Sequence, residues 1–168
     1  MKPNAIIYTS NTGFTAEYAR LLSERTGLPA YSLANAPLSR GNQVIYLGWL
    51  MAGKVQGYRK AAKLYHISAL CAVGMAPTGM QSDKVRKDNH VPAAVPVFTL
   101  QGGYAPEKLT GIYKLTLSAV VKALCKNLTE KADRTPTEDD TLALLTDGGS
   151  RVCPENLSGV LDWYALRN

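Results

Sequence analysis

One hydroxyl-rich stretch near the N-terminus organises this sequence: Tyr8-Thr9-Ser10-Asn11-Thr12-Gly13-Phe14-Thr15. The apolar run before it predicts a strand over residues 4–9, buried on both faces of a parallel sheet. The amphipathic pattern after it predicts a helix over residues 14–26. A loop between such a strand and helix directs free backbone N–H groups, and the positive end of the helix dipole, above the sheet edge. We therefore expect this loop to hold a phosphate.

The side chains of the loop fit the same interpretation. The groups able to donate to phosphate oxygens are the hydroxyls of Thr9, Ser10, Thr12 and Thr15 and the amide of Asn11. Gly13 removes a side chain where the ligand must approach. No lysine or arginine lies in the loop, which distinguishes it from a P-loop, and the G-x-G-x-x-G dinucleotide pattern is missing. An ordinary turn whose Ser10 or Thr12 caps the helix is the alternative, and the position at the first strand-to-helix turn favours the phosphate site.

Length and composition predict one domain over residues 1–168, with a helical insert at residues 101–152. A chain of 168 residues that is 46% hydrophobic and 19% charged is typical of a globular protein with a full core. No apolar run approaches the length of a membrane span, and Met1-Lys2-Pro3 leads directly into the first strand without a signal-peptide pattern. We expect a cytoplasmic protein whose three cysteines are reduced: Cys71, Cys125 and Cys153.

The charge and the metal-ligating residues restrict the function classes further. The net charge of +6 is spread over several helices without a nucleic-acid recognition motif, so we expect solvated helix faces and no nucleic-acid partner. The two histidines, His66 and His90, have no cysteine or carboxylate cluster near them in sequence. A metal site is therefore not expected.

Strand and helix patterns alternate along the chain, which predicts an α/β fold with a parallel sheet. Further strands are expected at residues 30–33, 43–48, 68–75 and 94–100, with helices at about 55–65 and ending near 89. Five such strands fit a three-layer sandwich with the order 2-1-3-4-5. In that order a ligand lies beyond the carboxyl ends of the strands, between the first and third.

Two more loops meet at this edge and form the rest of the candidate site. The second loop, at residues 48–54, contributes Trp49, Leu50, Met51, Ala52 and Gly53. The third loop contributes Met75, Ala76, Pro77, Thr78 and Gly79. Together they offer apolar surface for a flat ring and backbone groups for its polar edge. Trp49 or Met51 taken alone fits a core or rim position equally well.

The stretch Ser10-Asn11-Thr12-Gly13-Phe14-Thr15 resembles the T/S-x-T-G-x-T loop with which flavodoxins hold the phosphate of FMN. The layout after the fifth strand, with an insert over residues 101–152 before a terminal helix at 154–166, resembles the flavodoxin-fold menaquinone-dependent protoporphyrinogen oxidases. These resemblances imply a flavodoxin-like fold and FMN as cofactor, with residues 10–15 at the phosphate and the other two loops beside the ring. The basic charge departs from the acidic surface usual in electron-carrying flavodoxins.

Three functions remain open at this point. The first is an FMN-binding electron-transfer protein whose partner is a redox protein or a small-molecule acceptor. The second is an FMN-dependent oxidase or quinone reductase of the protoporphyrinogen-oxidase type, which the insert and the charge favour over a plain carrier. The third is a flavin-free interaction module on the same fold. No catalytic side chain is assigned, because the chemistry of such proteins belongs to the flavin.

The insert is predicted to contain two helices. The longer, at about residues 106–128, has an apolar arc wider than a surface helix needs. The shorter begins at the capping-box pattern Thr135-Pro136-Thr137-Glu138 and ends at Gly148-Gly149. We expect the two helices to pack on each other. A partner subunit or a quinone-bearing membrane surface is the less favoured neighbour for the apolar face of the long helix. A clear aromatic pair around the ring is missing, because the only tyrosine candidate to pair with Trp49 is Tyr104, in a different loop.

Overall fold

The computed structural model describes residues 2–167. Its central sheet has the order β2-β1-β3-β5-β6, and all four of these pairings are parallel. The parallel strands are β1 (Ala5–Thr9), β2 (Ala30–Ser32), β3 (Gln43–Met51), β5 (His66–Gly74) and β6 (Val97–Gln101). The prediction of an α/β fold with a mostly parallel sheet is confirmed.

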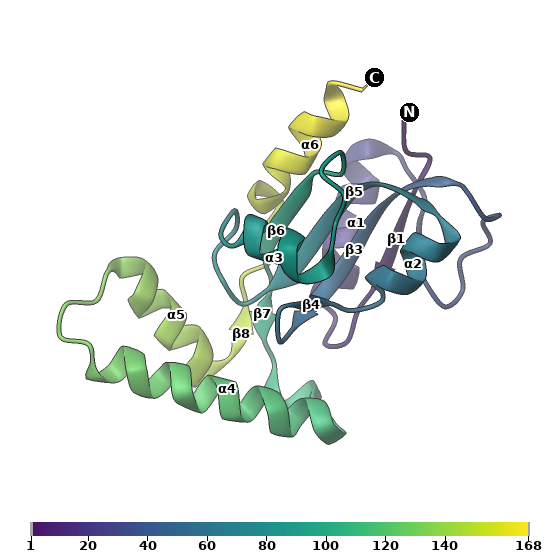
Figure 1. The fold of residues 1–168 in the computed structure, drawn as a ribbon. Coiled ribbons are helices and arrows are strands. Elements are labelled where there is room, and N and C mark those ends of the chain that lie inside the picture. The colour runs from purple at the N-terminus through teal and green to yellow at the C-terminus, as the bar shows by residue number, and fades with distance from the viewer. Residues whose placement is uncertain (1, 168) are drawn as a thin grey trace.

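Helices cover both faces of the sheet (Figure 1). One face carries α1 (Phe14–Thr26) and α6 (Ser158–Ala165), which follows a 3-10 turn at Pro154–Leu157. The other face carries α2 (Tyr58–Leu64) and α3 (Ser82–Asn89). This arrangement is a three-layer α/β sandwich.

Each face of the sheet has its own core because side chains of successive strand residues point to opposite faces. Ile6 and Ile45 pack on the side of α1 and α6, and Ile7 and Tyr46 pack on the side of α2 and α3. All four side chains are fully buried. The continuous apolar runs of β1 and β3 therefore reflect burial on both faces.

The sheet has one more strand than expected. Residues 52 and 53 form a two-residue turn, so Lys54–Val55 folds back as β4 and pairs antiparallel with the end of β3. The sheet thus has six strands instead of five, and its order, β2-β1-β3-β5-β6 with β4 beside β3, differs from the predicted 2-1-3-4-5 through the added strand β4. The helix expected at residues 55–65 is shortened to α2, because Val55 belongs to β4 and Gly57 takes the N-cap position.

A helical arm, residues 103–150, projects from the sandwich between β6 and α6 (Figure 1). Its neck is an antiparallel pair of two-residue strands, β7 (Gly103–Tyr104) and β8 (Gly149–Ser150). Beyond the neck follow a 3-10 turn (Pro106–Lys108), α4 (Gly111–Glu130) and α5 (Pro136–Asp147). A Cβ on Gly103 would lie 2.3 Å from the Gly149 carbonyl oxygen and 2.7 Å from Phe14 Cζ. The close approach of the neck to the end of α1 therefore requires glycine.

The two arm helices pack on each other, as expected, around a small core of their own. The core consists of Tyr104, Leu109, Val121, Leu144 and Leu145. The capping box of Thr135 and Glu138 is confirmed. The long helix, however, begins at residue 111 instead of 106, because Leu109 is extended and buried in the arm core. No helix within residues 2–167 is both long and apolar enough to cross a membrane.

Candidate functional site

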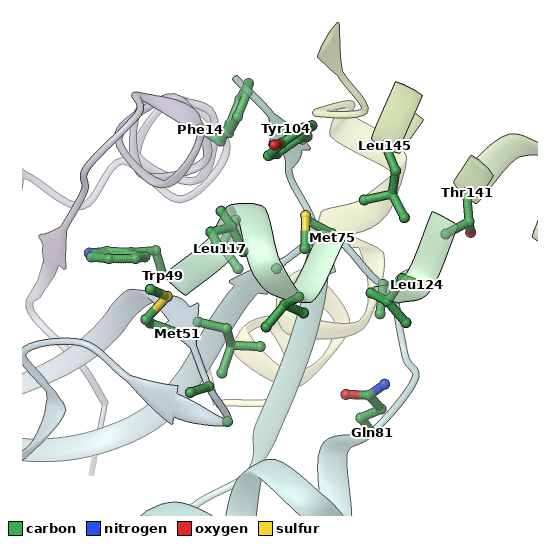
Figure 2. A pocket seen from close by; sticks show the side chains of 18 of the residues that line it. Phe14, Trp49, Met51, Met75, Gln81, Tyr104, Leu117, Leu124, Thr141 and Leu145 are labelled. Atoms are coloured by element: carbon green, nitrogen blue, oxygen red, sulfur yellow. The ribbon is translucent and has the colours of Figure 1, made fainter. Parts of the chain in front are cut away.

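A cavity of about 770 Å³ lies at the carboxyl ends of β1, β3 and β5 and beneath α4. Figure 2 shows Phe14 and Trp49 at one side of it, Met75 and Tyr104 beside α4, and Gln81 on the α3 side. β2 and β3 lie on opposite sides of β1, so this is the edge where an open parallel sheet forms its binding crevice. The fold therefore places the cavity where the sequence predicts a ligand.

The predicted phosphate loop forms one end of the cavity. Of the predicted residues 10–15, Asn11, Thr12 and Phe14 line it, whereas Ser10, Gly13 and Thr15 do not. Gly13 occupies the N-cap position of α1 with φ 104°, and no side chain caps this helix end. Thr15, in the first turn, is buried with 1% of its surface exposed. An uncapped N-terminus leaves backbone N–H groups free to bind an anion.

Ser10 and Thr9 differ in what their hydroxyls can do. Ser10 Oγ is buried and has no hydrogen-bond partner among the described residues. The Tyr46 hydroxyl lies 2.8 Å from Thr9 Oγ1 and 2.7 Å from the Gln56 carbonyl oxygen. Because a carbonyl only accepts, Tyr46 donates to Gln56 and Thr9 donates to Tyr46. The Thr9 hydroxyl is thus hydrogen-bonded to Tyr46, whereas the Ser10 hydroxyl is unpaired near the N-terminus of α1.

Burial raises the pKa of Tyr46 to about 12, so its phenol stays protonated and this support for the loop persists across physiological pH.

All five site residues predicted from the second loop lie in the cavity wall. Trp49, Leu50 and Met51 from the end of β3 line the cavity, as do Ala52 and Gly53. Ala52 and Gly53 have φ values of 47° and 76°, the paired positive values that a tight two-residue hairpin requires. Alanine is uncommon in the left-handed region. The turn also lacks the Asn-Gly or Asp-Gly pair that would have indicated a hairpin in the sequence.

Asn89 at the end of α3 holds the hairpin in place. Its side-chain oxygen accepts from the Val55 N–H at 2.8 Å, and its amide donates to the carbonyl oxygens of Gly53 and Val85, both at 2.9 Å. Only 7% of Asn89 is exposed. This residue, which the sequence analysis did not single out, fixes the backbone that carries Met51 and Ala52 into the cavity wall.

The third predicted loop divides into two parts. Met75, Ala76 and Pro77 line the cavity. Thr78 and Gly79 instead bind β6: Thr78 Oγ1 accepts from the Gln101 N–H at 2.9 Å, and the Gly79 N–H donates to the Thr99 carbonyl oxygen at 3.0 Å. These two residues therefore anchor the loop and do not line the cavity.

The arm supplies the outer wall of the cavity. Leu117, Val120 and Leu124 of α4 line the cavity together with Tyr104 of the neck and Leu145 of α5 (Figure 2). Their spacing of three and four residues puts the α4 side chains on one helix face. The wide apolar arc of this helix was the available signal, because one side packs on α5 and another faces the cavity.

The aromatic neighbour of Trp49 is not the candidate Tyr104. Tyr104 packs in the arm core with 7% exposure. Tyr113 of α4 instead meets Trp49 edge to face, with ring centroids 5.3 Å apart and planes at 81°. Sequence patterns could not find this pair, because it depends on where the arm folds back.

The charged side chains of the lining are paired. Lys84 binds Asp88 on α3, and this hydrogen bond lowers the pKa of the Asp88 carboxyl. Glu138 of α5 binds Lys131 at 2.6 Å, and that bond lowers the pKa of Glu138. Both carboxylates are therefore ionised at neutral pH, at the α3 and α5 edges of an otherwise largely apolar wall. Within residues 2–167, no three His, Cys, Asp or Glu side chains come together as a metal site.

Comparisons with protein-family models, curated proteins and solved structures found no match for this chain.

Proposed function

We propose that this protein is an FMN-binding, flavodoxin-like redox protein that transfers electrons to or from a protein partner or a small-molecule acceptor. One observation carries the proposal: a single cavity connects the uncapped N-terminus of α1 with the loops that follow β3 and β5. FMN combines a phosphate with a flat, largely apolar ring, and this cavity has a polar anion-binding end and an apolar remainder.

The residues at the polar end fit a phosphate. Ser10, Asn11, Thr12, Gly13, Phe14 and Thr15 would hold it. Burying an unpaired hydroxyl costs free energy, so Ser10 Oγ is a group whose missing partner a phosphate oxygen would supply. The absence of lysine and arginine from the loop leaves the helix end and neutral donors to stabilise the anion.

The ring would lie against Trp49, Leu50, Met51, Ala52 and Gly53 on one side and against Met75, Ala76 and Pro77 on another. Bound FMN would supply the electron-accepting and electron-donating chemistry. The protein's own residues exclude water with apolar side chains and orient the ring edge with backbone groups of the two loops. No ionisable side chain is required for proton transfer in this scheme.

The first experiment is the visible absorption spectrum of the purified protein, before and after incubation with FMN and desalting, followed by dithionite reduction. A retained flavin spectrum that bleaches reversibly is expected. Folded protein that retains no flavin, with no quenching of free FMN fluorescence on titration, would overturn the proposal in favour of an interaction module.

Replacement of Ser10 tests the phosphate end. Ser10→Ala should weaken FMN binding about tenfold, because a hydrogen bond to a charged group is lost. The same change should leave the ligand-free protein no less stable, because its hydroxyl has no partner there. Affinity for riboflavin, which lacks the phosphate, should not change.

Ser23→Ala is the matched control at the other end of α1, where the hydroxyl donates to the Leu28 carbonyl oxygen at 2.6 Å. It should lower stability and leave FMN affinity unchanged. A Thr12→Val/Thr15→Val double variant should also bind FMN more weakly while keeping the fold. Unchanged affinity in both phosphate-loop variants would place the phosphate elsewhere.

A second candidate is an FMN-dependent oxidase or quinone reductase. The observation that favours it is that the cavity is also bounded by Trp49, Tyr104 and apolar side chains of α4 and α5, where an apolar substrate would meet the arm. The assay is turnover of a quinone or porphyrinogen by the flavin-loaded protein. Turnover would favour the enzyme, whereas flavin that passes electrons only to protein acceptors would favour the carrier.

A further inference from the structure

The arm contacts the candidate flavin site through a small number of side chains. Its neck is a pair of two-residue strands, and α4 has its closest backbone neighbours in α5. Met75 from the end of β5 packs against the arm core, and Trp49 from β3 packs against Tyr113. The position of α4 above the cavity therefore depends on these contacts as well as on the neck.

Tyr113 contacts the cavity-lining Trp49 but does not line the cavity itself. Trp49 lines the cavity, whereas Tyr113 is absent from the lining and has 41% of its surface exposed. It lies four residues before Leu117 and seven before Val120, so it begins the helix stripe that forms the outer wall. Its ring meets the indole edge to face at a centroid distance of 5.3 Å, which is a favourable aromatic geometry.

We propose that Tyr113 is a positioning residue, which acts through Trp49 and makes the arm part of the flavin ring site. Contact with Tyr113 restricts the rotamers of the indole, so that Trp49 presents a fixed surface to the ring without reordering on binding. By the same contact, the indole holds the N-terminal end of α4 against the sandwich. This inference rests on the proposed function, since the ligand at issue is the flavin ring.

The test is a double-mutant cycle read out by FMN affinity. Tyr113→Ala should weaken FMN binding about threefold to tenfold, the range typical of an aromatic pair. Tyr113→Phe should restore binding to near the wild-type value, because it keeps the ring and loses only the hydroxyl. In a Trp49→Ala background, Tyr113→Ala should have little further effect, since the group through which it acts is gone.

A second measurement follows the indole without ligand. Trp49 emission, taken as the difference between wild-type and Trp49→Phe spectra, should shift to longer wavelength in Tyr113→Ala because the indole gains contact with water. Ile112→Ala is the control on the same turn: Ile112 is 73% exposed and lies off the cavity stripe. It should change neither the emission nor the affinity. If Tyr113→Ala loses the native far-UV CD spectrum, Tyr113→Leu, which keeps apolar bulk, should give the same weakening.

The outcomes separate this inference from the proposed function. Wild-type protein that binds no FMN would overturn both. Wild-type binding with an unchanged affinity in Tyr113→Ala, or with an equal loss in the Trp49→Ala background, would overturn the role of Tyr113 alone and leave the FMN site in place.

Discussion

The sandwich and the arm differ in how completely they bury their apolar side chains. The sandwich has a core on each face of its sheet, with Ile6, Ile45 and Leu70 fully buried. The arm has one small core and leaves Ile112 and Leu115 of α4 exposed at 73% and 74%. Stability is not uniform in such a molecule, because a region with few buried apolar contacts opens at lower free energy. The candidate site lies between the stable region and the less stable one.

Truncations of core side chains should give the largest difference in stability effects between the sandwich and the arm. Leu70→Ala, in the sandwich, should lower the free energy of unfolding by about 2–5 kcal/mol, because a fully buried side chain leaves a cavity. Leu144→Ala, in the arm core, should loosen the arm and leave the unfolding midpoint of the sandwich nearly unchanged. Urea unfolding followed by Trp163 emission in a Trp49→Phe background reports on the sandwich, because Trp163 packs beside its core. Equal midpoint shifts from both variants would mean that arm and sandwich unfold together.

Asn89→Ala should cause the next largest loss of stability. The loss should arise at the β3–β4 hairpin, which Asn89 anchors. Loss of its side chain leaves the buried Val55 N–H without its partner and should lower the free energy of unfolding by about 1–3 kcal/mol. Faster amide exchange at Val55 would locate the effect. Lys87→Ala, at an exposed position of the same helix, is the control and should stay within about 0.5 kcal/mol. A similar cost for both variants would contradict the anchoring role of Asn89.

Thr135→Ala should act on the arm alone. The Thr135 hydroxyl accepts from the Glu138 N–H at 3.3 Å, and the Glu138 carboxylate accepts from the Thr135 N–H at 2.9 Å. Removal of this cap should destabilise α5 by about 1 kcal/mol and accelerate exchange of its amides. Thr137→Ala, two residues on, keeps the capping box and serves as the control. A shift of the sandwich midpoint in Thr135→Ala would show stronger coupling than the small neck suggests.

Lowering the pH should give the smallest loss of stability, and this loss should appear first in the arm. Of the six ion pairs within the described residues, four lie in the arm or join it to the exit of its neck. Hydrogen bonds from Lys131 and Arg151 lower the pKa values of Glu138 and Asp140. Their stabilisation is present above the ordinary carboxyl pKa near 4 and is lost as pH falls through the lowered folded-state values.

The check is an NMR titration of α5 amides from pH 7 to pH 3, with amides of β1 and β3 as the internal reference. Arm signals should move or broaden at a higher pH than the sandwich signals. The effect should be modest because these pairs are exposed to solvent. Simultaneous changes in both regions would remove the electrostatic distinction between them.

Some elements could be predicted because their signals are local. The strand before the phosphate loop, the helix after it and the cap of α5 each depend on residues within a few positions of one another. The cavity-lining position of Trp49 to Gly53 also followed, because parallel strands end at one edge of the sheet. The hairpin at Ala52 and Gly53 did not follow, because alanine has no preference for the left-handed conformation that this turn imposes.

By itself, the sequence determined the α/β class, the buried parallel strands and a hydroxyl-rich loop between the first strand and the first helix. These follow from hydrophobic periodicity and from the chemistry of adjacent residues. Only the tertiary structure decided that Tyr113, and not Tyr104, meets Trp49, that Thr9 is engaged by Tyr46, and that the arm forms the outer wall of the cavity. The physical reason is that periodicity tells which face of a helix is apolar, whereas the surface that covers this face depends on long-range packing.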